Sequence, residues 1–151
     1  MTAVAYGPSP VPERRIPGAS SADVSRRMAR QARRDTRPEM VVRRALHAAG
    51  RRFRVQIRVP GRARRTIDIA FPRQKVAVFI DGCFWHRCPL HATSPAANGE
   101  WWDTKLAANE VRDRDTDLVL EENNWVVLRF WEHEPTDSVV AEIERHLQDR
   151  T

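Results

Sequence analysis

The chain has 151 residues, of which 41% are hydrophobic and five are tryptophan, so it can bury one core. No apolar run approaches the roughly 18 residues that a membrane span requires, and the N-terminus has no apolar signal segment. We therefore expect a cytoplasmic protein with no membrane partner, in which two cysteines favour metal binding over a disulfide.

The charge is divided unevenly along the chain. The net charge is +6, but residues 1–65 carry 17 of the 26 Lys and Arg with four acids, whereas residues 66–151 carry nine bases and 16 acids. All 17 bases in the front half are arginines, which suit bidentate contacts with phosphate. The front half is therefore expected to meet a polyanion, and the rear half to handle cations.

The first residues show little apolar pattern. Residues 1–20 contain four prolines and two glycines, which predicts a disordered tail before a single domain over 21–151. The stretch SRRMARQARR then predicts a short helix or basic arm on nucleic acid, with Arg26, Arg27 and Arg30 as DNA contacts. A solvated segment that only keeps the protein soluble is the alternative.

A helix is predicted to open at Thr36-Arg37-Pro38-Glu39 and to stop at Gly50. Its apolar residues recur at helical spacing: Val42, Ala45, Leu46 and Ala49. Thr36 and Glu39 fit a capping box, in which the carboxylate satisfies the Thr36 amide. The residues alone favour this structural role for Glu39 over a functional one.

Two strands follow, separated by a turn at Pro60-Gly61. In 53–59 the apolar residues Phe53, Val55, Ile57 and Val59 alternate with polar ones, which predicts one core face and one basic face. In 66–71 the residues Ile67, Ile69 and Phe71 are predicted to share a face opposite Asp68 and Ala70. An acid flanked by isoleucines is costly to desolvate, so Asp68 is predicted to be a metal ligand.

The stretch VAVFIDGCFWHRCPLH, residues 76–91, begins as a strand buried on both faces and ends at Asp81-Gly82. It is followed by a helix from about Trp101 to Asn123, a buried strand over 125–131, and an amphipathic helix from Thr136. Trp102 and Asp113 lie along one face of the first of these helices. The order α-β-β-β-α-β-α predicts an α/β fold with a mixed sheet flanked by helices.

A structural zinc site is predicted from four residues. Cys83, Cys88 and His91 are zinc-type ligands, and His133 can complete the site if its strand lies beside the central one. Four protein ligands leave no open position for water. Two free thiols and scattered histidines are the alternative.

The remaining histidine of this loop, His86, follows Asp81 and is predicted to lie across from Asp68. A Mg²⁺ ion held by carboxylates, together with an imidazole base, is what phosphodiester hydrolysis requires. Phe84 and Trp85 could belong to the core, but beside a basic surface they are better placed to wedge between bases.

At this point residues from about 21 to 149 resemble the very-short-patch-repair (Vsr) endonucleases, which nick DNA 5′ to the thymine of a T·G mismatch. The motifs that carry the resemblance are SRRMARQ, RDTRPE, the Asp68 strand, VFIDGCFWH, CPLH, LAANEVRDRD and LRFWEHE. The resemblance implies a restriction-endonuclease-like core and Mg²⁺-dependent hydrolysis of double-stranded DNA. It also suggests a nucleoid-associated monomer that could work with other DNA repair proteins.

The resemblance further implies roles for individual residues. The catalytic set is Asp68, His86, Glu39 and Asp113, and the Mg²⁺ ligands are Asp68 and the backbone carbonyl of Ile80. The zinc ligands are Cys83, Cys88, His91 and His133. The aromatic wedge is Phe84, Trp85 and Trp102, with Met28 entering from the other side of the duplex. Some members have Thr-His where this chain has Ile80-Asp81, and some have Cys at the position of His133.

Two other readings remain open from the residues. A restriction-type or other DNA nuclease on the same core would bind matched and mismatched duplexes equally. A non-catalytic zinc module that binds DNA would not respond to loss of Mg²⁺, but the pairing of Asp68 with His86 argues against it.

Overall fold

A computed structural model describes residues 36–83, 86, 88–90 and 98–151. The expected tail and basic arm, with Arg26, Arg27, Met28 and Arg30, lie outside the described residues, as do Phe84, Trp85 and His91. The described elements are α2 (Arg37–Ala48), β1 (Arg54–Val59), β2 (Arg62–Phe71), β3 (Val76–Asp81), α3 (Gly99–Glu122), β4 (Val126–Trp131) and α4 (Thr136–Asp149). The predicted order of helices and strands is confirmed.

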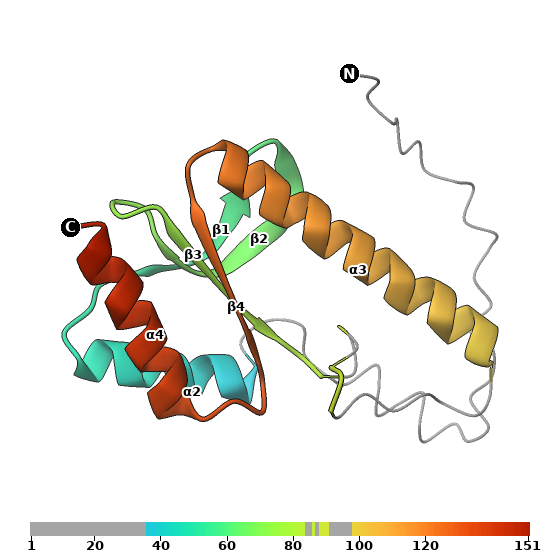
Figure 1. Cartoon of the computed structure of the whole chain (residues 1–151), viewed down its shortest axis with the longest axis horizontal. Helices are drawn as coiled ribbons and strands as arrows, with labels where there is room; N and C mark the ends of the chain where they lie inside the picture. Colours follow the sequence, from blue (N-terminus) through green and yellow to red (C-terminus); the bar gives the residue numbers. More distant parts are fainter. Residues whose placement is uncertain (1–35, 84–85, 87, 91–97) are drawn as a thin grey trace.

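The four strands form one mixed sheet in the order β1-β2-β3-β4. The pairs β1–β2 and β2–β3 are antiparallel, and β3 pairs with β4 in parallel, with Asp81 opposite Trp131. A parallel pair requires a crossover, which α3 supplies (Figure 1). Because β3 and β4 run in the same direction, the segments that follow them leave from the same edge of the sheet. This meets the condition set for His133.

Helices cover both faces of the sheet (Figure 1). On one face α2 and α4 pack through Leu46, Ile143 and Leu147 against apolar side chains of β2, β3 and β4. On the other face Leu120 of α3 packs against Phe79 and its neighbours. Every residue of β3 is buried, as its unbroken apolar run predicts. The result is a mixed α/β architecture, consistent with an endonuclease-like fold.

The predicted alternation in β1 and β2 is wrong at one point. Val55 is 42% exposed, and the next residue, Gln56, has a φ of 54°, in the left-handed region. In β2, Ile67 packs on the α3 side whereas Ile69 packs on the α2 and α4 side. The strand pairs 55–69 and 57–67 flank this irregularity, so the regular pleat breaks where Gln56 opposes Asp68.

The C-terminus of α2 is as predicted, but the capping box predicted at its N-terminus is absent. Its C-terminus is confirmed: Gly50 has a φ of 78°, and the Arg51 amide bonds to the Leu46 carbonyl at 3.0 Å, as in a Schellman motif. The side chain of Thr36 makes no cap hydrogen bond, so the predicted capping box does not form. Glu39 is instead buried and paired with Arg43, at 3.2 Å.

Among the described residues, no helix is long and apolar enough to cross a membrane.

Candidate active site and metal centre

Asp68 lies at the break in β2, where the ladder between β2 and β3 ends at Ile69 and Val78. Its Oδ2 accepts a hydrogen bond from the backbone amide of Ile80, at 2.9 Å. Burial raises the pKa of Asp68 to about 6, although the Ile80 amide and the positive charges of Arg129 and His86 oppose the rise. The structure therefore presents a carboxylate in surroundings that disfavour its charge, which is the setting expected of a cation ligand.

His86 is held by α3. Its Nδ1 lies 2.5 Å from Oδ2 of Asp113, so the protonated Nδ1 donates to the carboxylate and Nε2 is left for other contacts. Nε2 lies 3.9 Å from Oδ1 of Asp81. Burial alone would lower the pKa of His86, but the Asp113 hydrogen bond and the charges of Asp81 and Asp113 raise it overall. The face of α3 predicted to carry an acid does deliver Asp113 to the imidazole.

Arg129 of β4 is a part of this site that sequence reasoning missed. Its Nε lies 2.9 Å from Asp117, and its Nη1 lies 3.0 Å from Asp81. The guanidinium also sits 4.2 Å above the ring of Phe79. The signal was available, because a single arginine inside the apolar run VVLRFW needs a partner when buried. Arg129 thus partly compensates the charge of Asp81. Burial raises the pKa of Asp81 overall, and the positive charge of Arg129 opposes that rise.

A cavity of about 320 Å³ opens beside this cluster. Its lining includes His86, the acids Asp81, Glu110 and Asp113, and the bases Arg114 and Arg129. The volume suits a small polar group and not a whole nucleotide chain. The cavity therefore leaves room for a small group beside the imidazole of His86.

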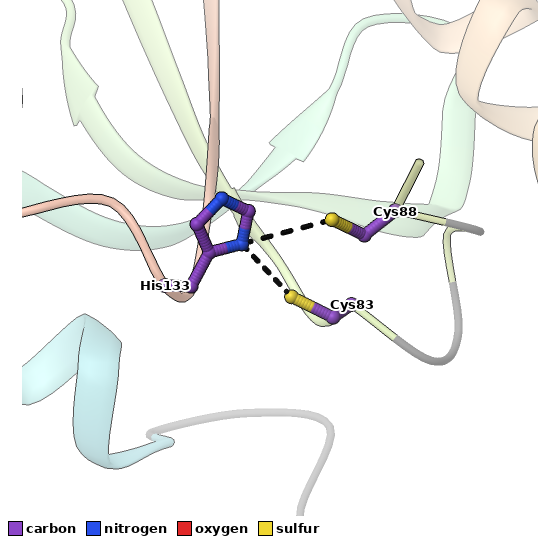
Figure 2. Close-up of side chains that lie close together, drawn as sticks. All are labelled: Cys83, Cys88 and His133. Carbon is purple, nitrogen blue, oxygen red and sulfur yellow. Dashed lines mark hydrogen bonds between the residues drawn. The ribbon is translucent and has the colours of Figure 1, made fainter. Parts of the chain in front are cut away.

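Cys83, Cys88 and His133 converge at the same edge of the sheet, as Figure 2 shows. Nδ1 of His133 lies 3.2 Å from Sγ of Cys83 and 3.7 Å from Sγ of Cys88. Both cysteines are buried and neither is in a disulfide. Burial raises the pKa of the Cys83 thiol to about 12. Two buried thiols facing an imidazole nitrogen form a donor set that zinc prefers. The fourth predicted ligand, His91, is outside the described residues.

The other predicted residues are placed as follows. Ile80 lies next to Asp68, because its backbone amide donates a hydrogen bond to the Asp68 carboxylate. Glu39 is buried in the first turn of α2 and paired with Arg43, and its neighbours Arg37 and Pro38 line a pocket together with Ile80. Trp102 is half-buried in the first turn of α3, edge-to-face with Trp101 at 4.6 Å. The structure thus groups Asp81, His86 and Asp113, holds Asp68 to the amide of Ile80 within electrostatic reach of His86, and separately assembles three of the four zinc-type ligands.

A family model described as DNA mismatch endonuclease Vsr matches residues 20–91. The Type II nicking enzyme V.NaeI of Lentzea aerocolonigenes is 42% identical over 84% of this chain and 78% of its own length. V.XorIIP, a Type II nicking enzyme of Xanthomonas oryzae pv. oryzae, is 37% identical over 68% of this chain and 74% of its own. The DNA mismatch endonuclease Vsr of Escherichia coli is 37% identical over 72% of this chain and 68% of its own length. On this similarity and the site geometry, the chain belongs to the Vsr family of DNA endonucleases.

Proposed function

We propose that this chain is a Mg²⁺-dependent endonuclease that nicks one strand of double-stranded DNA 5′ to the thymine of a T·G mismatch. The observation that carries the proposal is a buried carboxylate, Asp68, which the Ile80 amide holds and whose pKa responds to the charge of His86, the imidazole that Asp113 holds. The printed names of the relatives, nicking enzymes and a mismatch endonuclease, support the same reaction class.

The proposed cation ligands are the carboxylate of Asp68 and the backbone carbonyl of Ile80. The Ile80 amide already holds the Asp68 carboxylate, which fixes its direction before any cation arrives. When bound, Mg²⁺ would neutralise charge at phosphorus. Hard cations prefer such oxygen ligands, and a carboxylate with a pKa of about 6 gains its charge near neutral pH. Glu39 is proposed to act as a further acid that positions the hydrated cation.

The proposed base is His86. The Asp113 carboxylate accepts a hydrogen bond from Nδ1–H, so in the neutral imidazole the lone pair is on Nε2. Nε2 takes the proton from the water that attacks phosphorus, and the resulting imidazolium is stabilised by the carboxylates of Asp113 and Asp81. The same acids raise the pKa of His86, which strengthens it as a base.

The proposed structural metal is Zn²⁺, bound by Cys83, Cys88 and His133 with His91 as fourth ligand. Cys83 and Cys88 flank His86 in the chain, and His133 follows β4. A zinc ion would therefore tie the loop that carries the base to the neighbouring strand.

Mismatch recognition is proposed to come from an aromatic wedge formed by Phe84, Trp85 and Trp102, with Met28 on the other side. A T·G pair is already poorly stacked, so it is cheaper to unstack than a matched pair. The arginines of the front half, including Arg26, Arg27 and Arg30, supply affinity that is independent of sequence. Monomeric action in the nucleoid, with other repair proteins as potential partners, completes the proposal.

One assay tests this function. Labelled duplexes with T·G, C·G or A·T at one position are incubated with wild type, Asp68→Ala or His86→Ala, with and without Mg²⁺. The expected result is a single nick in the T·G duplex that needs Mg²⁺ and is lost in both variants, while DNA binding persists. Equal nicking of all duplexes would identify a nuclease without mismatch preference. Nicking that survives in both variants would refute the assigned active site.

A further inference from the structure

The acids that line the cavity beside His86 would repel an anionic ligand. Three acids line it, Asp81, Glu110 and Asp113, and the buried Asp68 interacts electrostatically with Asp81 and His86. Under the proposed function the reacting group is a phosphodiester, which is itself an anion. A phosphate that enters an acidic cavity needs positive partners on the protein as well as a cation.

Two arginines line this cavity, and one of them is already committed. The Arg129 side chain is only 21% exposed. Its Nη2 lies 2.7 Å from Oδ1 of Asp117, and its Nη1 lies 3.0 Å from Oδ1 of Asp81. Turning its guanidinium toward a ligand would leave two acids without their partner, which is costly when they are buried. Arg129 therefore serves the protein and not the substrate.

Arg114 is in a different position. It follows Asp113 directly on α3, its side chain is exposed, and it forms no ion pair within the part of the chain that the structure describes. Because Asp113 holds His86, a group bound by Arg114 would lie within reach of the same imidazole. The planar guanidinium can offer two parallel N–H donors to the non-bridging oxygens of a phosphate.

We propose that Arg114 binds the phosphate backbone of the DNA at the cavity where His86 acts, as the positive protein partner of the reacting strand. This inference rests on the proposed function, and it adds a substrate-contacting residue to the active site. The geometry that supports it is the placement of Arg114, which has no ion pair among the described residues, in a cavity whose other arginine is bound to acids, one residue from the acid that orients the base.

The chain supplies a matched control in Arg112. It is an exposed arginine on the same helix and does not line the cavity, and two helical residues differ by about 200° in direction. Arg114→Ala and Arg112→Ala therefore remove the same charge from opposite sides of α3. A third variant, Arg114→Lys, keeps the charge but loses the paired donors.

Nicking at saturating DNA and binding at several salt concentrations are measured for all three variants. Binding is measured in an Asp68→Ala background, where the strand stays intact. Arg114→Ala is expected to slow nicking about tenfold or more and to reduce the slope of log affinity against log salt by about 0.9, the value for one lost phosphate contact. Arg114→Lys should restore the slope but only part of the rate, and Arg112→Ala should leave both at wild-type values.

Thermal melting of each variant confirms that it is folded, which an exposed position should allow. The inference is overturned if Arg114→Ala and Arg112→Ala give the same rate and the same slope. Its failure is distinguishable from failure of the proposed function: if Asp68→Ala alone still nicks, the assigned active site is wrong. If Asp68→Ala is inactive while Arg114→Ala matches its control, only the role of Arg114 is wrong.

Discussion

At the scale of single residues, Asp68 makes folding dependent on pH. Burial raises its pKa from 3.8 to about 6, so the native protein holds this proton more tightly than the unfolded chain does. The sign follows from linkage: the stability associated with this group is fully present below about pH 4 and is lost as the pH rises through 6. At neutral pH without a cation, the charged Asp68 destabilises the fold.

Replacing Asp68 by Asn tests this directly. In EDTA, Asp68→Asn should be more stable than wild type by roughly 3 kcal/mol at pH 7.5, and by about 1 kcal/mol at pH 4.5, because the wild-type carboxyl is then mostly protonated. Urea denaturation at the two pH values measures the difference. Glu121→Gln, an exposed change on α3, is the control. An equal gain in the free energy of unfolding at both pH values would show that the charge of Asp68 does not destabilise the fold.

Asp113 should control the pH dependence of nicking through His86. Its carboxylate raises the pKa of His86, so Asp113→Asn lowers that pKa and also weakens the hold on Nδ1. The rate of nicking, followed from pH 5 to 9, should fall about 100-fold at its maximum, with the rising limb at lower pH than in wild type. A reduced rate with an unmoved limb would contradict the assignment of His86 as the titrating base.

At the scale of elements, the C-terminus of α3 depends on a left-handed residue. Asn124 has a φ of 66°, and the Trp125 amide bonds to the Leu120 carbonyl at 3.0 Å. Glycine adopts this conformation without steric cost, so Asn124→Gly should stabilise the protein by up to about 1 kcal/mol. Asn123→Gly should destabilise it instead, because Asn123 has a φ of −94° and its side chain bonds to the Val119 carbonyl. Thermal melting of the two variants measures the effect: the melting temperature should rise in Asn124→Gly and fall in Asn123→Gly, and a change of the same sign in both would contradict the prediction.

The elements also show what the sequence can and cannot predict. The buried β3, the stop at Gly50 and the order of elements follow from local signals, namely an unbroken apolar run, turn residues and helical spacing. The parallel neighbours β3 and β4 then place His133 near Cys83, as predicted. The pleat break at Gln56 and Asp68 was not predictable, because it arises from how two strands pair. The Arg129 contacts depend on α3 and β3 together, and so on tertiary structure. Glu39 differs, because its partner Arg43 lies four residues further along the same helix, and the spacing of Thr36 and Glu39 favoured the cap over this local pair.

At the scale of the whole molecule, the proposed zinc site joins segments that are far apart in the chain. Cys83 and His133 are 50 residues apart in sequence. Purified protein should contain one zinc per chain, and Cys88→Ser should lower both the melting temperature and the nicking activity, since zinc binds the assembled native site and not the unfolded chain. Elemental analysis and melting curves measure both effects. A metal-free protein that melts and nicks normally would rule the site out.

The crossover between β3 and β4 has a consequence for the order in which the protein becomes competent. Strands β1, β2 and β3 follow one another through short turns, whereas β4 joins β3 only after the whole of α3. Both side-chain clusters span that gap. In one, Asp113 contacts His86 and Arg129 contacts Asp81, and in the other His133 contacts Cys83. The arginine-rich half of the chain is therefore synthesised first, and neither side-chain cluster can be complete until β4 has docked beside β3.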